Sequence, residues 1–215
     1  MAVAKRVSSN DVHQDDEGGE YVLRDRLRVC REEHGATDER TLECMNVLGM
    51  LMQLQGKHAE AGALYRECLA GQRAALGSKH IETLYCMNNL ASLLHAQGNM
   101  VEAVPLMREA LDTARATLGP QHSSTVTFVS FLASMLQTQG NTSEAESLYR
   151  EALEVRLATL GPKHLGTISL MGNLGLLLKD QGRLGEAETL LRRALEVCRA
   201  TLGSLHPDTL GTQIR

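Results

Sequence analysis

Apolar residues recur at the spacing of an amphipathic helix along most of the chain. Between residues 84 and 94 they are three or four positions apart and form one stripe, which contains Leu84, Met87, Leu90, Ala91 and Leu94. The segment Gln97-Gly98-Asn99 interrupts this stripe, and a second one runs from about Val101 to Leu118, before Gly119. Because glycine tolerates the left-handed conformation that commonly follows a helix, each glycine predicts a helix end. The pattern therefore predicts two helices joined by a short turn.

The same pattern returns every 42 residues without a gap. The repeated columns include Gly35, Gly77, Gly119, Gly161 and Gly203, and also Thr41, Thr83, Thr125, Thr167 and Thr209. Glu-Ala pairs begin at Glu60, Glu102, Glu144 and Glu186, and the same register holds Arg66, Arg108, Arg150 and Arg192. A two-helix unit cannot bury its own apolar faces, so several units must stack to form a continuous core. The period therefore predicts an all-α solenoid of antiparallel helix pairs.

Small residues occupy the positions where the two helices of a unit are expected to cross most closely. These pairs are Gly49 with Ala61, Ala91 with Ala103, Ala133 with Ala145, and Gly175 with Ala187. A larger side chain there would push the helices apart and leave voids. Between units, the hydroxyls of Ser123, Ser124 and Thr125 are expected to cap the helix that follows.

The second unit resembles a known repeat family. Its residues Leu90-Ala91, Leu94, Gly98, Ala103, Met107 and Ala110 stand at the offsets of the tetratricopeptide pattern. The 42-residue period, with Asn88-Asn89-Leu90-Ala91 and Leu202-Gly203-Ser204-Leu205-His206, is similar to the extended form found in kinesin light chains and nephrocystin-like proteins. The resemblance implies a tetratricopeptide-type α-solenoid with a right-handed superhelix.

On this pattern, residues 1–18 are a polar, disordered tail and residues 19–215 form the solenoid. A partial helix at 20–34 precedes four repeats at 42–75, 84–117, 126–159 and 168–201, and a truncated repeat covers 208–215. Kinesin light chains carry a long heptad region ahead of their repeats, whereas about 20 residues precede the first helix here. The resemblance therefore predicts repeat architecture and leaves open whether a kinesin motor is involved. Solenoid ends without polar caps also suggest head-to-tail self-association.

In repeats of this kind the first helices line a concave groove, which the resemblance makes the candidate binding site. Its predicted lining residues are Asn46, Met50, Tyr85, Asn88, Asn89, Ser92, His95, Phe131, Ser134, Asn173, Leu176 and Lys179. Asn89 and Asn173 match the family position whose amide holds the backbone of a ligand. The lining contains few charges, so we expect a protein or peptide partner of modest charge. The alternative is a solvated inner surface, or one that packs on a neighbouring chain.

A histidine also recurs, at His80, His122, His164 and His206. Equivalent positions in stacked units lie about 10 Å apart, whereas zinc binds nitrogen at about 2.0–2.1 Å, so these histidines cannot share an ion. We expect each of them to hold its own inter-repeat turn through a hydrogen bond. No phosphate-binding loop, nucleophile elbow or zinc-protease motif occurs. The sequence therefore predicts no metal, no cofactor and no catalytic site.

Charge and composition exclude several classes of protein. The net charge of −4 argues against nucleic-acid binding. The sequence contains no run of 18 apolar residues, so it predicts no membrane-spanning helix. Five cysteines without a C-x-x-C pair indicate reduced thiols that fill the core, and residues 1–18 contain no apolar leader. We therefore expect a cytoplasmic, non-catalytic scaffold or adaptor. The alternatives are a regulatory segment of a larger, possibly enzymatic protein and a self-stacking structural unit.

Overall fold

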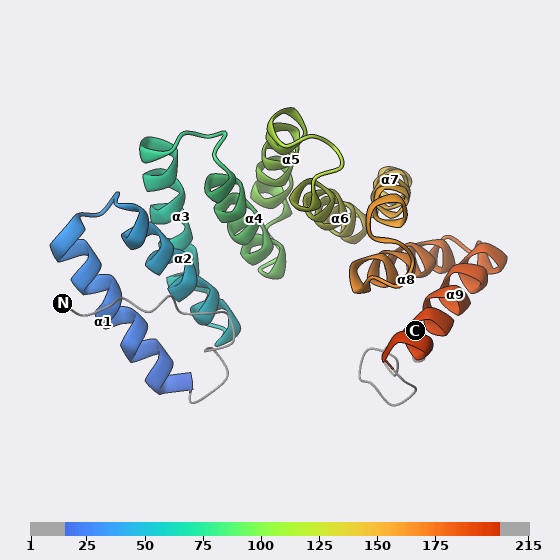
Figure 1. Cartoon of the computed structure of the whole chain (residues 1–215), viewed down its shortest axis with the longest axis horizontal. Helices are drawn as coiled ribbons and strands as arrows, with labels where there is room; N and C mark the ends of the chain where they lie inside the picture. The colour runs from blue at the N-terminus through green and yellow to red at the C-terminus, as the bar shows by residue number, and fades with distance from the viewer. Residues whose placement is uncertain (1–15, 203–215) are drawn as a thin grey trace. The chain divides into compact units, whose positions relative to one another are not determined.

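The computed structural model describes residues 16–202, which form helices joined by short turns (Figure 1). The helices are α1 (Asp16–His34), α2 (Glu39–Leu54), α3 (His58–Ala75), α4 (Ile81–Ala96), α5 (Met100–Thr117), α6 (Ser123–Thr138), α7 (Thr142–Leu160), α8 (Leu165–Asp180) and α9 (Leu184–Leu202). The all-α prediction is confirmed for this part of the chain. None of these helices is long and apolar enough to cross a membrane.

The chain divides into two compact units that meet within α5, after Leu106. In the first unit, α2 packs against α1 and α3, and α4 packs against α3 and also touches α2. In the second unit, α7 packs against α6 and α8, α9 packs against α8, and α6 touches α8. Within each unit, the earlier first helix, α2 or α6, therefore contacts its own second helix and also the first helix of the following repeat.

Two predicted segments fall at the margins of the described chain. The helix α1 begins at Asp16, so residues 16–18, which we expected in the tail, are its first turn. The remainder of the predicted tail and the truncated repeat at 208–215 lie outside the described residues.

The small residues predicted at the helix crossings are fully buried or nearly so. A Cβ atom added to Gly49 would lie 2.7 Å from Cε1 of Tyr65 on α3. One added to Gly175 would lie 2.7 Å from Cγ of Leu191 on α9. Both distances are shorter than carbon atoms tolerate, so the glycines allow the close approach of the two helices of a repeat.

The turns follow one plan in every repeat. A glycine with φ between 74° and 89° follows each of the helices α1 to α8, as the glycine columns predicted. At the start of the next first helix, Nδ1 of His80, His122 and His164 accepts a hydrogen bond from the backbone N–H two residues later, at 3.1 to 3.3 Å. Asp38 makes the same contact at the start of α2, at 3.0 Å.

This arrangement confirms that the histidines hold the turns, except for His206, which lies outside the described residues. It also shows that the expected hydroxyl caps were wrong. The N-cap of α6 is His122, and Ser123, Ser124 and Thr125 follow it inside the helix. A histidine whose Nδ1 carries no proton presents an acceptor lone pair to the helix N-terminus, as aspartate or serine does at other N-caps.

The recurring threonine has a structural role that the pattern did not reveal. Thr41, Thr83, Thr125 and Thr167 are all completely buried. The hydroxyls of Thr83 and Thr167 donate to the carbonyls of Gly77 and Gly161, each at 2.9 Å, and so tie the first helix to the turn before it. The Oγ1 atoms of Thr41 and Thr125 are buried without a hydrogen-bond partner.

Ion pairs join successive second helices in a ladder with a constant spacing of 36 residues. The pairs are Arg24–Glu60, Arg31–Glu67, Arg66–Glu102, Arg108–Glu144, Arg115–Glu151 and Arg150–Glu186, with N···O distances of 2.5 to 3.2 Å. The hydrogen bond from Arg108 lowers the pKa of the Glu144 carboxyl below its ordinary value. These six ion pairs thus connect consecutive repeats.

Candidate functional site: the faces of the first helices

All of the predicted groove residues lie on the first helices α2, α4, α6 and α8, and each is half-buried or exposed. The first unit contains Asn46, Met50, Tyr85, Asn88, Asn89, Ser92 and His95, and the second contains Phe131, Ser134, Asn173, Leu176 and Lys179. Neighbouring positions on the same helices, such as Leu48, Leu90 and Leu174, are buried in the core. The structure therefore places seven of the predicted residues on the first helices of the first unit and five on those of the second.

The surface of the first unit is rich in amides. Nδ2 of Asn89 on α4 donates to Oδ1 of Asn46 on α2 at 2.9 Å and links the first helices of consecutive repeats. Nδ2 of Asn88 lies 3.5 Å from Oδ1 of Asn89, which is a weak contact. Oδ1 of Asn88 is buried and has no hydrogen-bond partner. A buried acceptor of this kind is costly unless a donor reaches it.

Two apolar side chains accompany these amides. Met50 on α2 is 47% exposed and Tyr85 on α4 is 38% exposed. Asn89, the residue predicted to hold a ligand backbone, already uses its amide to hold Asn46. In this structure Asn88 has the unpaired acceptor, which the family pattern alone did not distinguish from its neighbour.

The surface of the second unit has a different chemistry. Ser130 stands where Asn46 does two repeats earlier, and its Oγ donates to the carbonyl of Val126 on its own helix at 2.7 Å. The contact between α6 and α8 instead includes Nε2 of Gln137 and Oδ2 of Asp180, 3.5 Å apart. Phe131 and Leu176 are half-buried beside the exposed Lys179. This surface is more apolar than its counterpart.

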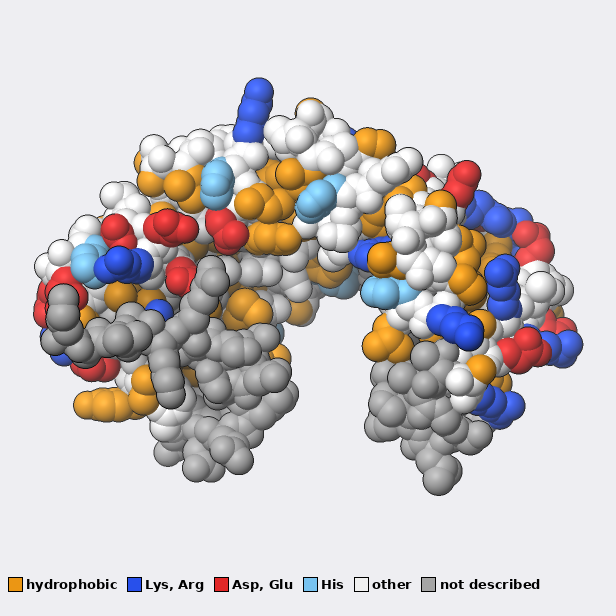
Figure 2. Space-filling model, in the orientation of Figure 1, with side chains coloured by type: hydrophobic (Ala, Val, Ile, Leu, Met, Phe, Trp, Pro, Cys, Tyr) orange, Lys and Arg blue, Asp and Glu red, His pale blue; other side chains and the backbone are white. Residues whose placement is uncertain are grey.

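A small acidic pocket opens at the N-terminal ends of α2 and α4. Its volume is about 150 Å³, and its lining consists of Glu39, Leu42, Glu43, Asn46, Gln72, Leu76 and Glu82. Figure 2 shows acidic side chains (red) grouped on the visible face of the first unit. The predicted groove lining did not include Glu39 or Glu82, because these residues precede the helical positions that were assigned to the groove. Gln72 was also not included, because it lies near the end of the second helix α3.

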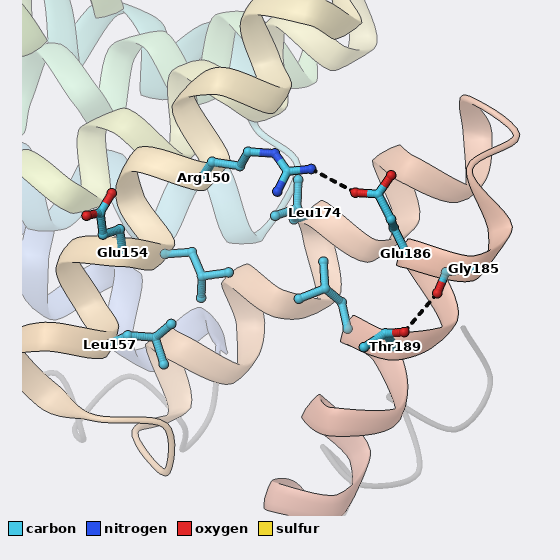
Figure 3. Close-up of a pocket in the computed structure, with 9 residues that line it drawn as sticks. Arg150, Glu154, Leu157, Leu174, Gly185, Glu186 and Thr189 are labelled. Atoms are coloured by element: carbon cyan, nitrogen blue, oxygen red, sulfur yellow. Dashed lines mark hydrogen bonds and ion pairs between the residues drawn. The ribbon is translucent and has the colours of Figure 1, made fainter.

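A second kind of pocket lies between consecutive second helices. In Figure 3, Leu157 of α7, Leu174 of α8 and Thr189 of α9 surround it, and the ion pair between Arg150 and Glu186 spans it at 3.2 Å. Its volume is about 500 Å³. A pocket of about 600 Å³ in the first unit uses the equivalent positions three repeats earlier, and its lining includes Arg24, Leu27, Arg31, Leu48, Glu60, Ala63 and Leu64.

The sequence contained a signal for the difference between these two pockets. At the pocket of the first unit, Arg31 pairs with Glu67. At the pocket of the second unit, the equivalent positions hold Leu157 and Arg193. Leu157 and Arg193 cannot form an ion pair, so the series of pairs that includes Arg31–Glu67 and Arg115–Glu151 has no member there. The wall of the second unit's pocket therefore has an aliphatic side chain at this place. A comparison of residues 36 positions apart would have shown the missing ion pair. An alignment on the 42-residue period does not place those two residues side by side.

The thiols of Cys44 and Cys86 are shifted away from the reactive thiolate form. Burial raises the pKa of the Cys44 thiol to about 11, and a hydrogen bond with Cys68 together with burial raises the pKa of Cys86. Cys44, Cys68, Cys86 and Cys198 are buried and Cys30 is half-buried, in agreement with a core-filling role. Within residues 16–202 no group of three or more His, Cys, Asp or Glu side chains is arranged to hold a metal ion.

Comparisons with known structures agree with this fold. The chain superposes on the nearly identical TPR-like repeats of a kinesin light chain candidate from Podospora anserina, with a TM-score of 0.74, 23% identity and coverage of 87% of this chain and 89% of that one. BtubC (BKLC) from P. vanneervenii gives a TM-score of 0.73 at 21% identity, covering 97% of this chain and 82% of that one. The apo form of RapI gives 0.77 at 12% identity, with coverage of 89% and 67%.

No curated protein matches the chain in sequence. The structural similarities, all below 25% identity, establish the fold and confirm the expected resemblance to kinesin light chain-type repeats. The family model for the tetratricopeptide repeat matches residues 46–116 and 125–200, which together are more than half of the chain. The chain therefore belongs to the tetratricopeptide repeat family.

Proposed function

We propose that the protein is a non-catalytic interaction scaffold or adaptor that binds a peptide segment of a partner protein on the faces of its first helices. The observation that supports this most directly is the buried, unpaired Oδ1 of Asn88 beside the exposed side chains of Met50 and Tyr85. A peptide backbone N–H would satisfy the amide acceptor. Apolar peptide side chains would cover the two exposed residues.

The surface of the second unit would extend this recognition with a different preference. Phe131 and Leu176 favour apolar side chains, while Asn173 on the same helix as Leu176 carries a half-buried amide. The second helices carry the ion pairs of the repeat-to-repeat ladder, whereas the predicted groove residues of the first helices include the amides of Asn46, Asn88 and Asn173. We place this scaffold in the cytoplasm, with a partner of modest overall charge.

The test uses random peptides displayed on phage, selected on the immobilised chain and then measured by fluorescence anisotropy. The variant Met50→Ala/Tyr85→Ala removes the two apolar contacts, and we expect the selected peptides to bind it at least about tenfold more weakly. The matched control is Val101→Ala/Leu160→Ala, which truncates two exposed apolar residues on second helices. Equal weakening by both variants, or by neither, would contradict binding on the first-helix faces.

A second candidate is self-association, which the exposure of large apolar residues on α1 and α9 favours. Tyr21 is 75%, Val22 61% and Leu184 65% exposed. Contact between copies would cover them and make the measured mass rise with concentration. Sedimentation velocity across a dilution series tests this, and a constant monomer mass would exclude it.

A further inference from the structure

The polar lining of the acidic pocket in the first unit consists of three carboxylates and two side-chain amides, with no cationic side chain among them. Glu39 and Glu43 on α2 and Glu82 on α4 line it, and none of the three carboxylates forms an ion pair within the described chain. The residue Gln72 is only 4% exposed, and its Oε1 atom is buried without a hydrogen-bond partner. An acceptor left unpaired in this way costs about 1–3 kcal/mol, which a donor from a ligand would recover.

Helix capping explains part of this cluster but not all of it. Glu39 and Glu82 lie in the first turns of their helices, where the helix dipole favours an acidic side chain. Glu43 is one turn further along, beyond that effect, and Gln72 comes from α3. Arg40, which follows Glu39 in the chain, lies with its Nη1 atom 3.2 Å from Nε2 of His34. The pocket therefore holds more acceptors than capping requires.

The repeat two periods later shows what fits such a place. Arg156 stands at the position equivalent to Gln72, and its Nη2 atom donates to the carbonyl of Ser123 at 3.3 Å and to Oγ1 of Thr127 at 3.2 Å. Its Cζ atom lies 3.8 Å from the point where a Cβ of Gly166 would be. The guanidinium thus donates to positions 123 and 127 on α6 and lies where a side chain at position 166 on α8 would meet it.

Those three positions are the equivalents of the three acidic residues in the first unit. Subtracting two periods of 42 residues converts Ser123, Thr127 and Gly166 into positions 39, 43 and 82, which are all glutamate. The same subtraction converts Arg156 into position 72, where a glutamine replaces the arginine. The first unit therefore lacks its own guanidinium and surrounds the corresponding place with carboxylates.

We propose that this pocket binds the guanidinium group of an arginine side chain from the partner peptide. The inference rests on the proposed function, because Asn46 lines both this pocket and the amide-rich surface. Arginine is the preferred ligand because its planar group has five N–H donors that can reach several carboxylates and the amide oxygen of Gln72 at once. The ammonium of lysine has three donors and cannot pair with a carboxylate in a bidentate fashion.

The experiment titrates the ¹⁵N-labelled full chain with Nα-acetyl-arginine amide and follows its NMR spectrum. We expect saturable shifts of the Gln72 side-chain amide and of backbone signals at the starts of α2 and α4. Glu43→Gln and Glu82→Gln should each weaken binding about tenfold, because each removes one charged acceptor. Nα-acetyl-lysine amide should bind several-fold more weakly. The matched control Glu188→Gln makes the same change on α9 and should leave the affinity within about twofold.

A further variant, Gln72→Arg, supplies an internal guanidinium in the place that Arg156 fills in the second unit. It should retain the helical circular dichroism of the native chain and lose the arginine-induced shifts. The inference is overturned by the absence of saturable shifts in the native chain, by equal binding of the lysine compound, or by undiminished binding to Gln72→Arg.

Failure of this inference can be distinguished from failure of the proposed function. If the selected peptides depend on Met50 and Tyr85 while blocked arginine does not bind, peptide recognition stands and the arginine pocket is refuted. If blocked arginine binds as expected but the peptides do not depend on Met50 and Tyr85, the pocket stands and the proposed groove is refuted.

Discussion

Replacing Thr83 by valine should destabilise the protein, whereas the same change at Thr41 should not. Both threonines are completely buried at the same position of their repeats. The hydroxyl of Thr83 donates to the carbonyl of Gly77 at 2.9 Å, and the Oγ1 atom of Thr41 has no partner. Valine has nearly the same shape and is also β-branched, so the comparison isolates the hydroxyl from packing and helix propensity.

The magnitudes follow from the two environments. Thr83→Val loses a hydrogen bond and leaves the Gly77 carbonyl without it, so the free energy of unfolding should fall by about 1–2 kcal/mol. Thr41→Val removes a buried polar group that has no partner, so stability should stay unchanged or rise by up to about 1 kcal/mol. The two variants should therefore differ by about 2 kcal/mol.

Urea unfolding followed by far-ultraviolet circular dichroism measures this difference from the transition midpoints, provided that the slope of each transition is unchanged. Thr167→Val and Thr125→Val give an independent repeat of the comparison in the second unit, because only Thr167 donates to a turn carbonyl. Equal destabilisation by the members of each pair would refute the reasoning, since it would show that the hydroxyl contact to the turn contributes nothing.

Three further outcomes follow from the helix caps and the ladder. His122→Ala should lower the free energy of unfolding by about 1 kcal/mol, while His122→Asp should restore it because Asp38 caps α2 in the same way; urea midpoints decide. A double-mutant cycle on Arg108 and Glu144, whose side chains are 43% and 35% exposed, should give a coupling of at most about 1 kcal/mol that declines with salt. The pKa of the Glu144 carboxyl is lowered in the folded protein, so this carboxylate stabilises the fold at pH values above its ordinary pKa of 4.5. This contribution should vanish as the pH falls below 4.5. Glu144→Gln should therefore lose less stability than the native chain over the same acidification.

Much of the fold was predictable because each helix depends on local spacing. The stripe through Leu84 and Leu94 and the glycines after each helix gave correct helices, and the small residues at Gly49 and Gly175 indicated where helices cross. The capping residue was mistaken because serine and threonine are the commonest N-caps, and position alone does not show that the imidazole of His122 turns back to its own helix.

The candidate site was only partly predictable. The residues on the face of the first helices followed from the repeat register. Whether Asn88 or Asn89 keeps an unpaired acceptor depends on which of the two amides reaches Asn46 on the preceding first helix, α2. The prediction that the groove carries few charges omitted Glu39 and Glu82, because these precede the helical positions used for the lining. Such groups come together only when the end of one helix packs beside the start of two others.

By itself, the sequence determined the helices, their ends and their order, because the 3.6-residue periodicity and the conformational freedom of glycine act within a few residues of chain. The tertiary structure decided which polar groups find partners. The 36-residue ion-pair ladder, the buried hydroxyls of the threonine column and the acidic pocket around Gln72 all join residues from different helices. Their energies depend on distances of a few ångströms across packed surfaces, which a repeat alignment does not contain.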